Sequence, residues 1–150
     1  MTRWLALLAL VIPLAGRAEG AWEVNGIRLE AAQVERLADD LAGRTLDAVM
    51  ANVADLELAP PQRERMRAIY RTTALDVYGR AIPVIQDASL TEEAKRERVR
   101  ELALEGQRKS HEELASVLDA RQLAAYSEWE DAQVAAFRSR RLDGRRRGSR

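Results

Sequence analysis

Apolar residues recur at helical spacing through nearly all of the chain after residue 28, glycines and prolines are few, and the prolines at residues 60, 61 and 83 stand between the periodic runs. This pattern is typical of amphipathic helices, whose apolar side chains repeat every three or four residues. It predicts four helices: residues 29–56, residue 60 to near 82, residues 91–118, and residue 119 onward into the arginine-rich end of the chain. The predicted fold class is therefore all-α.

Each predicted helix carries an apolar stripe that we expect to face the core. The stripes contain, in chain order, Val34, Leu37, Leu41, Val49, Val53 and Leu56; Met66, Ile69, Tyr70, Thr73 and Val77; Val99, Leu102, Gly106, Leu114 and Val117; and Leu123, Tyr126, Trp129, Val134 and Phe137. Pro60 can begin the second helix, because proline is tolerated in a first turn. Pro83 is expected to kink or end that helix near Ile82.

A short strand signal precedes the helices. Residues 22–24 and 27–29 flank Asn25-Gly26, a two-residue turn signature. Arms of three residues are not stable alone. The segment is therefore interpreted as a turn that leads into the first helix.

The first twenty residues have the layout of a cleavable secretion signal. Arg3 supplies a positive charge, and residues 4–14 are almost wholly apolar. Gly16 and Ala18 occupy the −3 and −1 positions for a cut before Glu19, and Ala18 and Gly20 offer a second frame for a cut after residue 20. The apolar run is shorter than the roughly 20 residues that span a bilayer, and Pro13 interrupts it, which argues against a retained anchor. We expect residues 1–20 to be the signal, and the mature chain to be soluble and periplasmic.

Charge is distributed unevenly, although the formal net charge is zero. Residues 19–137 contain 15 Lys and Arg against 23 Asp and Glu, whereas residues 138–150 contain seven Arg and one Asp. Blocks of like charge are usually solvated and often disordered. The prediction is an all-helical domain at 21–137 and a disordered tail at 138–150, which either solubilises the chain or binds an anionic partner. Export argues against nucleic acid as that partner.

A five-residue pattern recurs where helices are expected to begin. It reads Leu29-Glu-Ala-Ala-Gln33, Leu58-Ala-Pro-Pro-Gln62 and Leu118-Asp-Ala-Arg-Gln122, with a partial copy at Leu90-Thr-Glu-Glu-Ala94. In the third complete copy, Asp119 and Gln122 have the spacing of a capping box, and Leu118 is placed to pack on the first turns as a hydrophobic staple. Ala59 offers no side-chain acceptor, so prolines are expected to define the start at residue 60. The motif thus predicts helix entry, with no chemistry of its own.

The copies at Leu58–Gln62 and Leu118–Gln122, in an exported helical chain, resemble the paired Leu-Thr-x-x-Gln motifs of the Spy/CpxP-type periplasmic proteins. Ala59 and Asp119 replace the threonine of that family. The resemblance implies a four-helix elongated hairpin that dimerises antiparallel into a cradle. It also implies an ATP-independent chaperone, or a regulatory partner of an envelope-stress sensor, that binds unfolded or envelope proteins.

Other functions find less support among the residues. A periplasmic heavy-metal sensor is an alternative, with His111, Glu112, Glu113 and Glu105 as a weak ligand set, but a zinc or nickel site needs several converging ligands. Met50 and Met66 are better explained as core residues than as copper ligands. The chain has no cysteine and no phosphate-binding loop, and Ser110 would point away from His111 on a helix. We therefore expect no enzyme, no cofactor and no metal site.

The apolar stripes exceed what a thin helical hairpin can bury by itself. Core packing is the default role of the aromatic residues. Apolar surface left over after folding marks a partner site, which favours a homodimer or a client-binding face. Candidate contact residues are Met66, Ile69, Tyr70, Tyr126 and Trp129. A non-catalytic helical adaptor for one envelope protein is the remaining alternative.

Overall fold

A computed structural model describes the backbone of residues 17–18, 21–24, 27–53 and 56–147, and the side chains of residues 30–53, 56–133 and 135. Four helices make up the body of the chain: α2 (Ala31–Asn52), α3 (Pro60–Gln86), α4 (Glu92–Leu114) and α5 (Ala120–Arg147). The predicted helical class and the four helices are confirmed.

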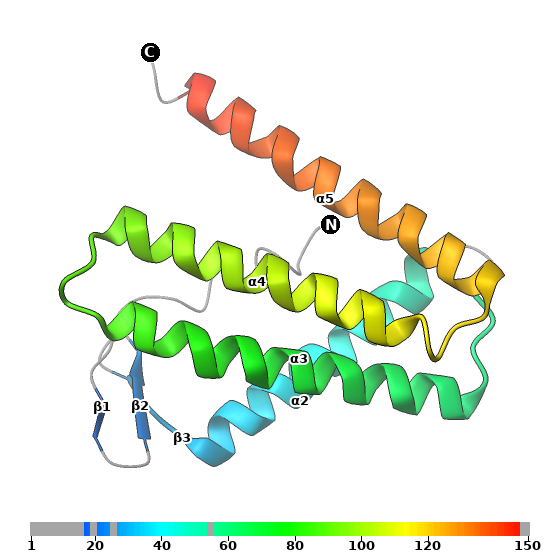
Figure 1. Cartoon of the computed structure of the whole chain (residues 1–150), viewed down its shortest axis with the longest axis horizontal. Coiled ribbons are helices and arrows are strands. Elements are labelled where there is room, and N and C mark those ends of the chain that lie inside the picture. The colour runs from blue at the N-terminus through cyan, green and yellow to red at the C-terminus, as the bar shows by residue number, and fades with distance from the viewer. Residues whose placement is uncertain (1–16, 19–20, 25–26, 54–55, 148–150) are drawn as a thin grey trace.

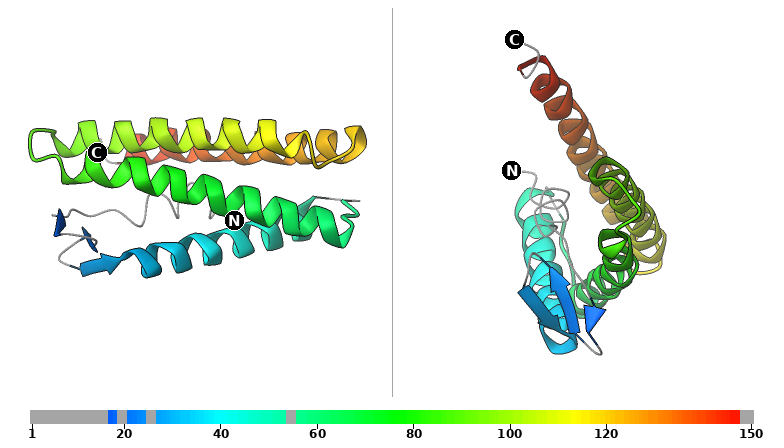
Figure 2. Two further views of the ribbon diagram at one scale, coloured as in Figure 1. Left: turned by 60° about the horizontal axis from the view of Figure 1, so that its bottom comes forward. Right: turned by 90° about the vertical axis from the view of Figure 1, so that its left-hand side faces the viewer.

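Helix α3 is central. It lies between α2 on one flank and α4 on the other (Figure 1). Helices α3 and α4 run antiparallel and are joined by residues 87–91. Seen end-on, the helices form a curved layer that is one helix thick (Figure 2). Helix α5 begins beside the end of α4 and then diverges from it (Figure 1).

A small antiparallel sheet precedes α2, where the sequence predicted only a turn. Strands β2 (Ala21–Val24) and β3 (Ile27–Glu30) pair across residues 25–26, with Val24 opposite Ile27. A third strand, β1 (Arg17–Ala18), pairs with β2. Short arms become stable when another strand and a helix support them. Here β1 supports one side of the hairpin, and β3 leads directly into α2.

Helix α3 continues through Pro83, so the prediction that it could end near Ile82 is wrong. Proline removes one helical hydrogen bond, but the residues on both sides of it are held by packing. Ile82 is buried, and Ile85 is buried in a cluster with Val99 and Leu102 of α4. Burial of a large aliphatic side chain stabilises by about 1.5–3 kcal/mol, which is comparable to the penalty of the proline.

Close packing of α3 against α4 depends on small side chains. A Cβ atom added at Gly106 would lie 2.6 Å from Cγ2 of Val77 and 3.2 Å from Cγ2 of Thr73. Gly106 therefore allows the two helix backbones to approach each other. Its predicted inward position is confirmed by its burial.

Three helix ends differ from the sequence prediction. Helix α2 ends at Asn52, and α4 ends at Leu114, followed by turns at residues 115–117. The backbone of residues 138–147 continues α5 beyond Phe137, into the segment where the helix was expected to end. Arginine is a good helix former, and no proline interrupts this segment. Residues 148–150 lie outside the described residues.

The apolar stripes predict the core with one clear error. Leu37 was expected to face inward, but 38% of it is exposed. The neighbouring Ala38 is fully buried and packs with Leu41 and Ala74, because a small residue lets α2 approach α3. The side chains of Val134 and Phe137 lie outside the described ones.

None of the helices described contains an apolar stretch long enough to cross a membrane. The predicted secretion signal falls almost entirely outside the described residues, which begin at residue 17.

Candidate functional site

Each complete copy of the helix-start motif makes the same kind of hydrogen bond within its own helix start. At the starts of α2, α3 and α5, a glutamine Oε1 accepts from the backbone N–H three residues earlier. The donor–acceptor distances are 2.7 Å for Glu30 and Gln33, 2.9 Å for Ala59 and Gln62, and 3.0 Å for Asp119 and Gln122. In the partial copy, Oγ1 of Thr91 accepts from the N–H of Ala94 at 3.2 Å. Each copy satisfies donors that a helix start leaves free.

The capping box predicted at Asp119 is present. Oδ1 of Asp119 accepts from the N–H of Gln122 at 2.8 Å, while Gln122 returns the bond to the N–H of Asp119. At Ala59 only the glutamine half of the box exists, and Pro60 begins the helix directly after it. The start of α5 is therefore capped by a complete capping box, whereas the start of α3 combines the glutamine bond with a proline.

The motifs also bind each other across the fold. Nε2 of Gln62 donates to Oε1 of Gln122 at 2.9 Å and to the carbonyl of Val117 at 2.9 Å. Nε2 of Gln122 donates to the carbonyl of Glu57 at 2.6 Å. Each glutamine thus reaches the carbonyl directly before the other motif's leucine. We call these two glutamines and two carbonyls the amide clasp; it joins the entries of α3 and α5.

The motif leucines anchor the clasp in the main core. Leu58 and Leu118 are both buried. They belong to one cluster that also contains Ala42, Val49, Val53, Leu56, Met66, Tyr70, Leu114 and Tyr126. The amide clasp therefore lies next to the main core cluster, and the leucines of both motifs are buried in that cluster.

A line of polar side chains crosses this core from α3 to α4. The buried side chains of Tyr70 and Tyr126 interact with each other. The hydroxyl of Tyr126 also donates to Oε1 of Glu130 at 3.2 Å, and Oε2 of Glu130 lies 2.7 Å from Nδ1 of His111. We call these four residues the polar line. It links α3, α5 and α4 in that order.

Both tyrosines of the polar line remain protonated. Burial raises the pKa of Tyr126 well above its usual range, and the neighbouring Tyr70 and Glu130 raise it further. Burial likewise raises the pKa of Tyr70. Desolvation disfavours the charged phenolate, so neither hydroxyl can act as a base near neutral pH. Both are neutral polar groups, and that of Tyr126 donates a hydrogen bond to Glu130.

The five predicted contact residues lie in or against the core. Met66, Tyr70 and Tyr126 are buried, while Ile69 and Trp129 are partly buried and pack against the same cluster. The buried three are therefore not on an accessible face, and that part of the expectation is corrected. Met66 and Tyr70, near the start of α3, are in one core cluster with Tyr126 of α5, and Trp129 packs against it. The rings of Tyr126 and Trp129 are tilted by 45°, with centroids 5.8 Å apart.

The expected weak ligand set does not come together. His111 contacts Glu130 of α5, and Glu105 pairs with Arg80 of α3. Among the side chains described, no group of three or more His, Asp and Glu residues could hold a metal ion. Ser110 donates to the carbonyl of Gln107 at 2.9 Å, which leaves it directed along its own helix.

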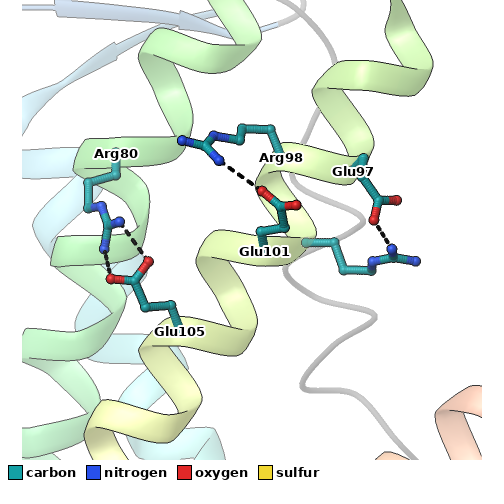
Figure 3. A network of polar contacts seen from close by, with 6 residues as sticks. Arg80, Glu97, Arg98, Glu101 and Glu105 are labelled. Atoms are coloured by element: carbon teal, nitrogen blue, oxygen red, sulfur yellow. Dashed lines mark hydrogen bonds and ion pairs between the residues drawn. The ribbon is translucent and has the colours of Figure 1, made fainter.

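Ion pairs follow the outer surface of the helix contacts. Arg80 of α3 makes a two-pronged contact with Glu105 of α4, at 2.7 and 3.0 Å (Figure 3). Within α4, Arg98 pairs with Glu101, which Figure 3 also shows. Arg100 pairs with Glu97 on the same helix. Arg80 holds the pKa of the Glu105 carboxyl below its usual range. These exposed charges are typical of solvated helix faces.

Sequence reasoning missed the amide clasp and the pairing of His111 with Glu130. One signal for the clasp was present, since the two glutamines occupy the same place in two motif copies. The contact between Tyr126 and Glu130 also has helical spacing, four residues apart. The imidazole contact had no local signal, because it depends on where α5 crosses α4.

Comparison of the chain with protein-family models, with curated proteins and with solved structures finds no match in any of the three.

Proposed function

We propose that the chain is a non-catalytic, exported binding protein of the periplasm. It acts as an ATP-independent chaperone, or as the regulatory partner of an envelope-stress sensor, in the manner of Spy/CpxP-type proteins. The motif copies at residues 58–62 and 118–122 carry the resemblance. Their pairing through Gln62 and Gln122 supports a common structural role for both copies.

The thin curved layer is the observation that carries the proposal (Figure 2). A layer one helix thick leaves two broad faces without a covering layer of its own, which suits a protein that holds an extended chain. Leu37 and Leu104 are the exposed large apolar residues among the side chains described. They lie on α2 and α4, the two helices that flank α3.

In this proposal the client contacts are these two leucines, and not the buried Met66, Tyr70 and Tyr126. Single apolar contacts of this kind are weak, because an exposed leucine contributes only the area that a client covers. Weak and exchangeable contacts allow a client to fold or leave without ATP. In the full assembly, two chains pair antiparallel into a cradle with their apolar residues facing the client.

The test is a titration of aggregation suppression with the mature chain beginning at Glu19. We expect an equimolar or larger dose to reduce light scattering by a chemically unfolded test protein. Sedimentation of the same sample should show a dimer. Leu37→Ser and Leu104→Ser should weaken suppression, whereas Ala68→Ser, at an exposed position of α3, serves as the matched control.

Unchanged scattering at every dose contradicts the chaperone proposal. Suppression that the leucine variants leave intact would place the client elsewhere on the molecule. A single stoichiometric partner in a periplasmic pull-down, without suppression, would identify a helical adaptor instead.

A further inference from the structure

His111 lies where α5 passes over α4. Its Nδ1 atom is 2.7 Å from Oε2 of Glu130, and its ring centroid is 6.0 Å from that of Tyr126. The Glu130 side chain is only 14% exposed, whereas that of His111 is 35% exposed. A carboxylate withdrawn from water requires partners. Glu130 has a hydroxyl from its own helix on one oxygen and the imidazole of α4 on the other.

The first helix pair has uncharged residues in the corresponding places. Counting from the start of each helix, Met50 of α2 corresponds to His111 of α4, and Tyr70 of α3 corresponds to Glu130 of α5. Tyr70 is buried, and Met50 packs against the main core cluster. The first pair therefore has uncharged side chains at the level where the second pair has a histidine and a carboxylate.

We propose that His111 and Glu130 form a proton-controlled latch between α4 and α5, tight when the imidazole is charged and looser when it is neutral. An imidazolium and a carboxylate make a charge-assisted hydrogen bond, about twice as strong as one between neutral groups. Histidine side chains change charge between about pH 5 and 8. The latch therefore holds α5 firmly in mild acid and releases it in mild base.

The other groups around His111 do not reverse this sign. From α5 it meets Tyr126, with which Tyr70 of α3 interacts; both side chains are neutral. The charged residues near it in sequence on α4 are Arg108, Lys109, Glu112 and Glu113, which are exposed or half-exposed. Water screens these side chains, and their charges balance. Glu130 is the charged group in direct contact.

Release of the latch would leave α5 held by the amide clasp at its start. Glu130 lies about three helical turns beyond that start. Beyond the clasp, α5 diverges from α4 (Figure 1). Loosening the contact at Glu130 therefore increases local opening of α5 while the entries of α3 and α5 stay joined.

The composition of the chain makes the test direct, because it has one histidine and no cysteine. Hydrogen exchange of the mature chain is measured at about pH 5.5 and about pH 8, and each rate is divided by the intrinsic rate at that pH. We expect protection of the α5 amides around Glu130 to fall about five-fold to ten-fold at the higher pH, since a hydrogen bond to a charged group contributes about 1 kcal/mol more than a neutral one. Protection in α3 should change little.

Glu130→Gln keeps the size and a hydrogen-bonding oxygen but removes the charge. Its α5 protection should be the same at both pH values and should resemble that of the wild type at about pH 8. His111→Gln should behave similarly and provides a second variant if one of them folds poorly. Glu128→Gln changes an exposed carboxylate on the same helix and should retain the full pH response.

The latch is overturned if wild-type protection in α5 does not depend on pH, or if Glu130→Gln responds as the wild type does. No client is present in this measurement. A failure of the latch is thus distinguishable from a failure of the proposed chaperone function.

Discussion

The two helix pairs, α2 with α3 and α4 with α5, are built on one plan but packed differently. Every buried position of α4 is numbered 61 higher than a buried position at α2 or its C-terminal cap. The pairs are Val34 and Lys95, Ala38 and Val99, Leu41 and Leu102, Ala42 and Ala103, Thr45 and Gly106, Val49 and Ser110, and Val53 and Leu114. The second helices begin at residues 60 and 120. The two halves of the chain therefore repeat a pattern of buried positions as well as the helix-start motif.

The two pairs differ in the helices that pack against their second helix, α3 or α5. Helix α3 is packed between α2 and α4, whereas α5 diverges from α4 after its first turns (Figure 1). Met66 and Tyr126 are equivalent and both buried, but the next equivalent pair is Tyr70 and the partly exposed Glu130. The two motif copies thus position the starts of α3 and α5 in the same way. They do not ensure equal packing farther along the helices.

Removing the motif leucines tests the shared part of the plan and should have the largest effect. Leu58→Ala and Leu118→Ala each leave a cavity in the same core cluster. Both should lower the free energy of unfolding by about 2–5 kcal/mol, measured by urea denaturation followed by circular dichroism. Leu37→Ala, at an exposed position, should change it far less. A large loss for only one motif leucine would break the equivalence of the two copies.

Exchanging residues at one equivalent position tests whether the two first helices differ in closeness of approach. Gly106→Thr introduces into α4 the residue that α2 has at Thr45. The new Cβ would lie within contact distance of Val77, which is stiff at its own Cβ. A loss of about 1–3 kcal/mol in stability is expected from overpacking. A neutral result would show that α3 and α4 can separate without penalty.

The amide clasp offers the finest comparison. Gln62→Ala and Gln122→Ala each remove a side chain that bridges both motifs, and each should reduce stability by about 1–2 kcal/mol. Because the two amides bind each other, the double variant should lose less than the sum of the single losses. A double-mutant cycle from thermal and urea unfolding measures this coupling. Strict additivity would contradict a direct contact between the glutamines.

Periodicity and helix-start chemistry predicted most of the fold, because both are local. Helix starts at Pro60 and Thr91 follow from proline geometry and capping. The inward rotation of α2 around Ala38, which exposes Leu37, was not predictable in this way. A small residue is buried only where a neighbouring helix comes close, and that distance is a tertiary property.

The candidate site was predictable to a smaller extent. The spacing of Asp119 and Gln122 predicted the capping box, since both partners lie in one turn. The bond between Gln62 and Gln122 spans sixty residues and requires α3 and α4 to reverse the chain first. The burial of Met66, Tyr70 and Tyr126 likewise depends on α5, whose crossing point no local pattern specifies.

The amide clasp has a consequence for the order of folding. The segment between its two glutamines contains nearly all of α3 and the whole of α4, so the clasp is a contact of high sequence separation. The loop-closure entropy of such a contact opposes its early formation. Helices α3 and α4, joined by a short connection, would pair first and bring residues 62 and 122 together. The clasp then marks completion of the chain's assembly, and during unfolding it is among the first tertiary contacts to be lost.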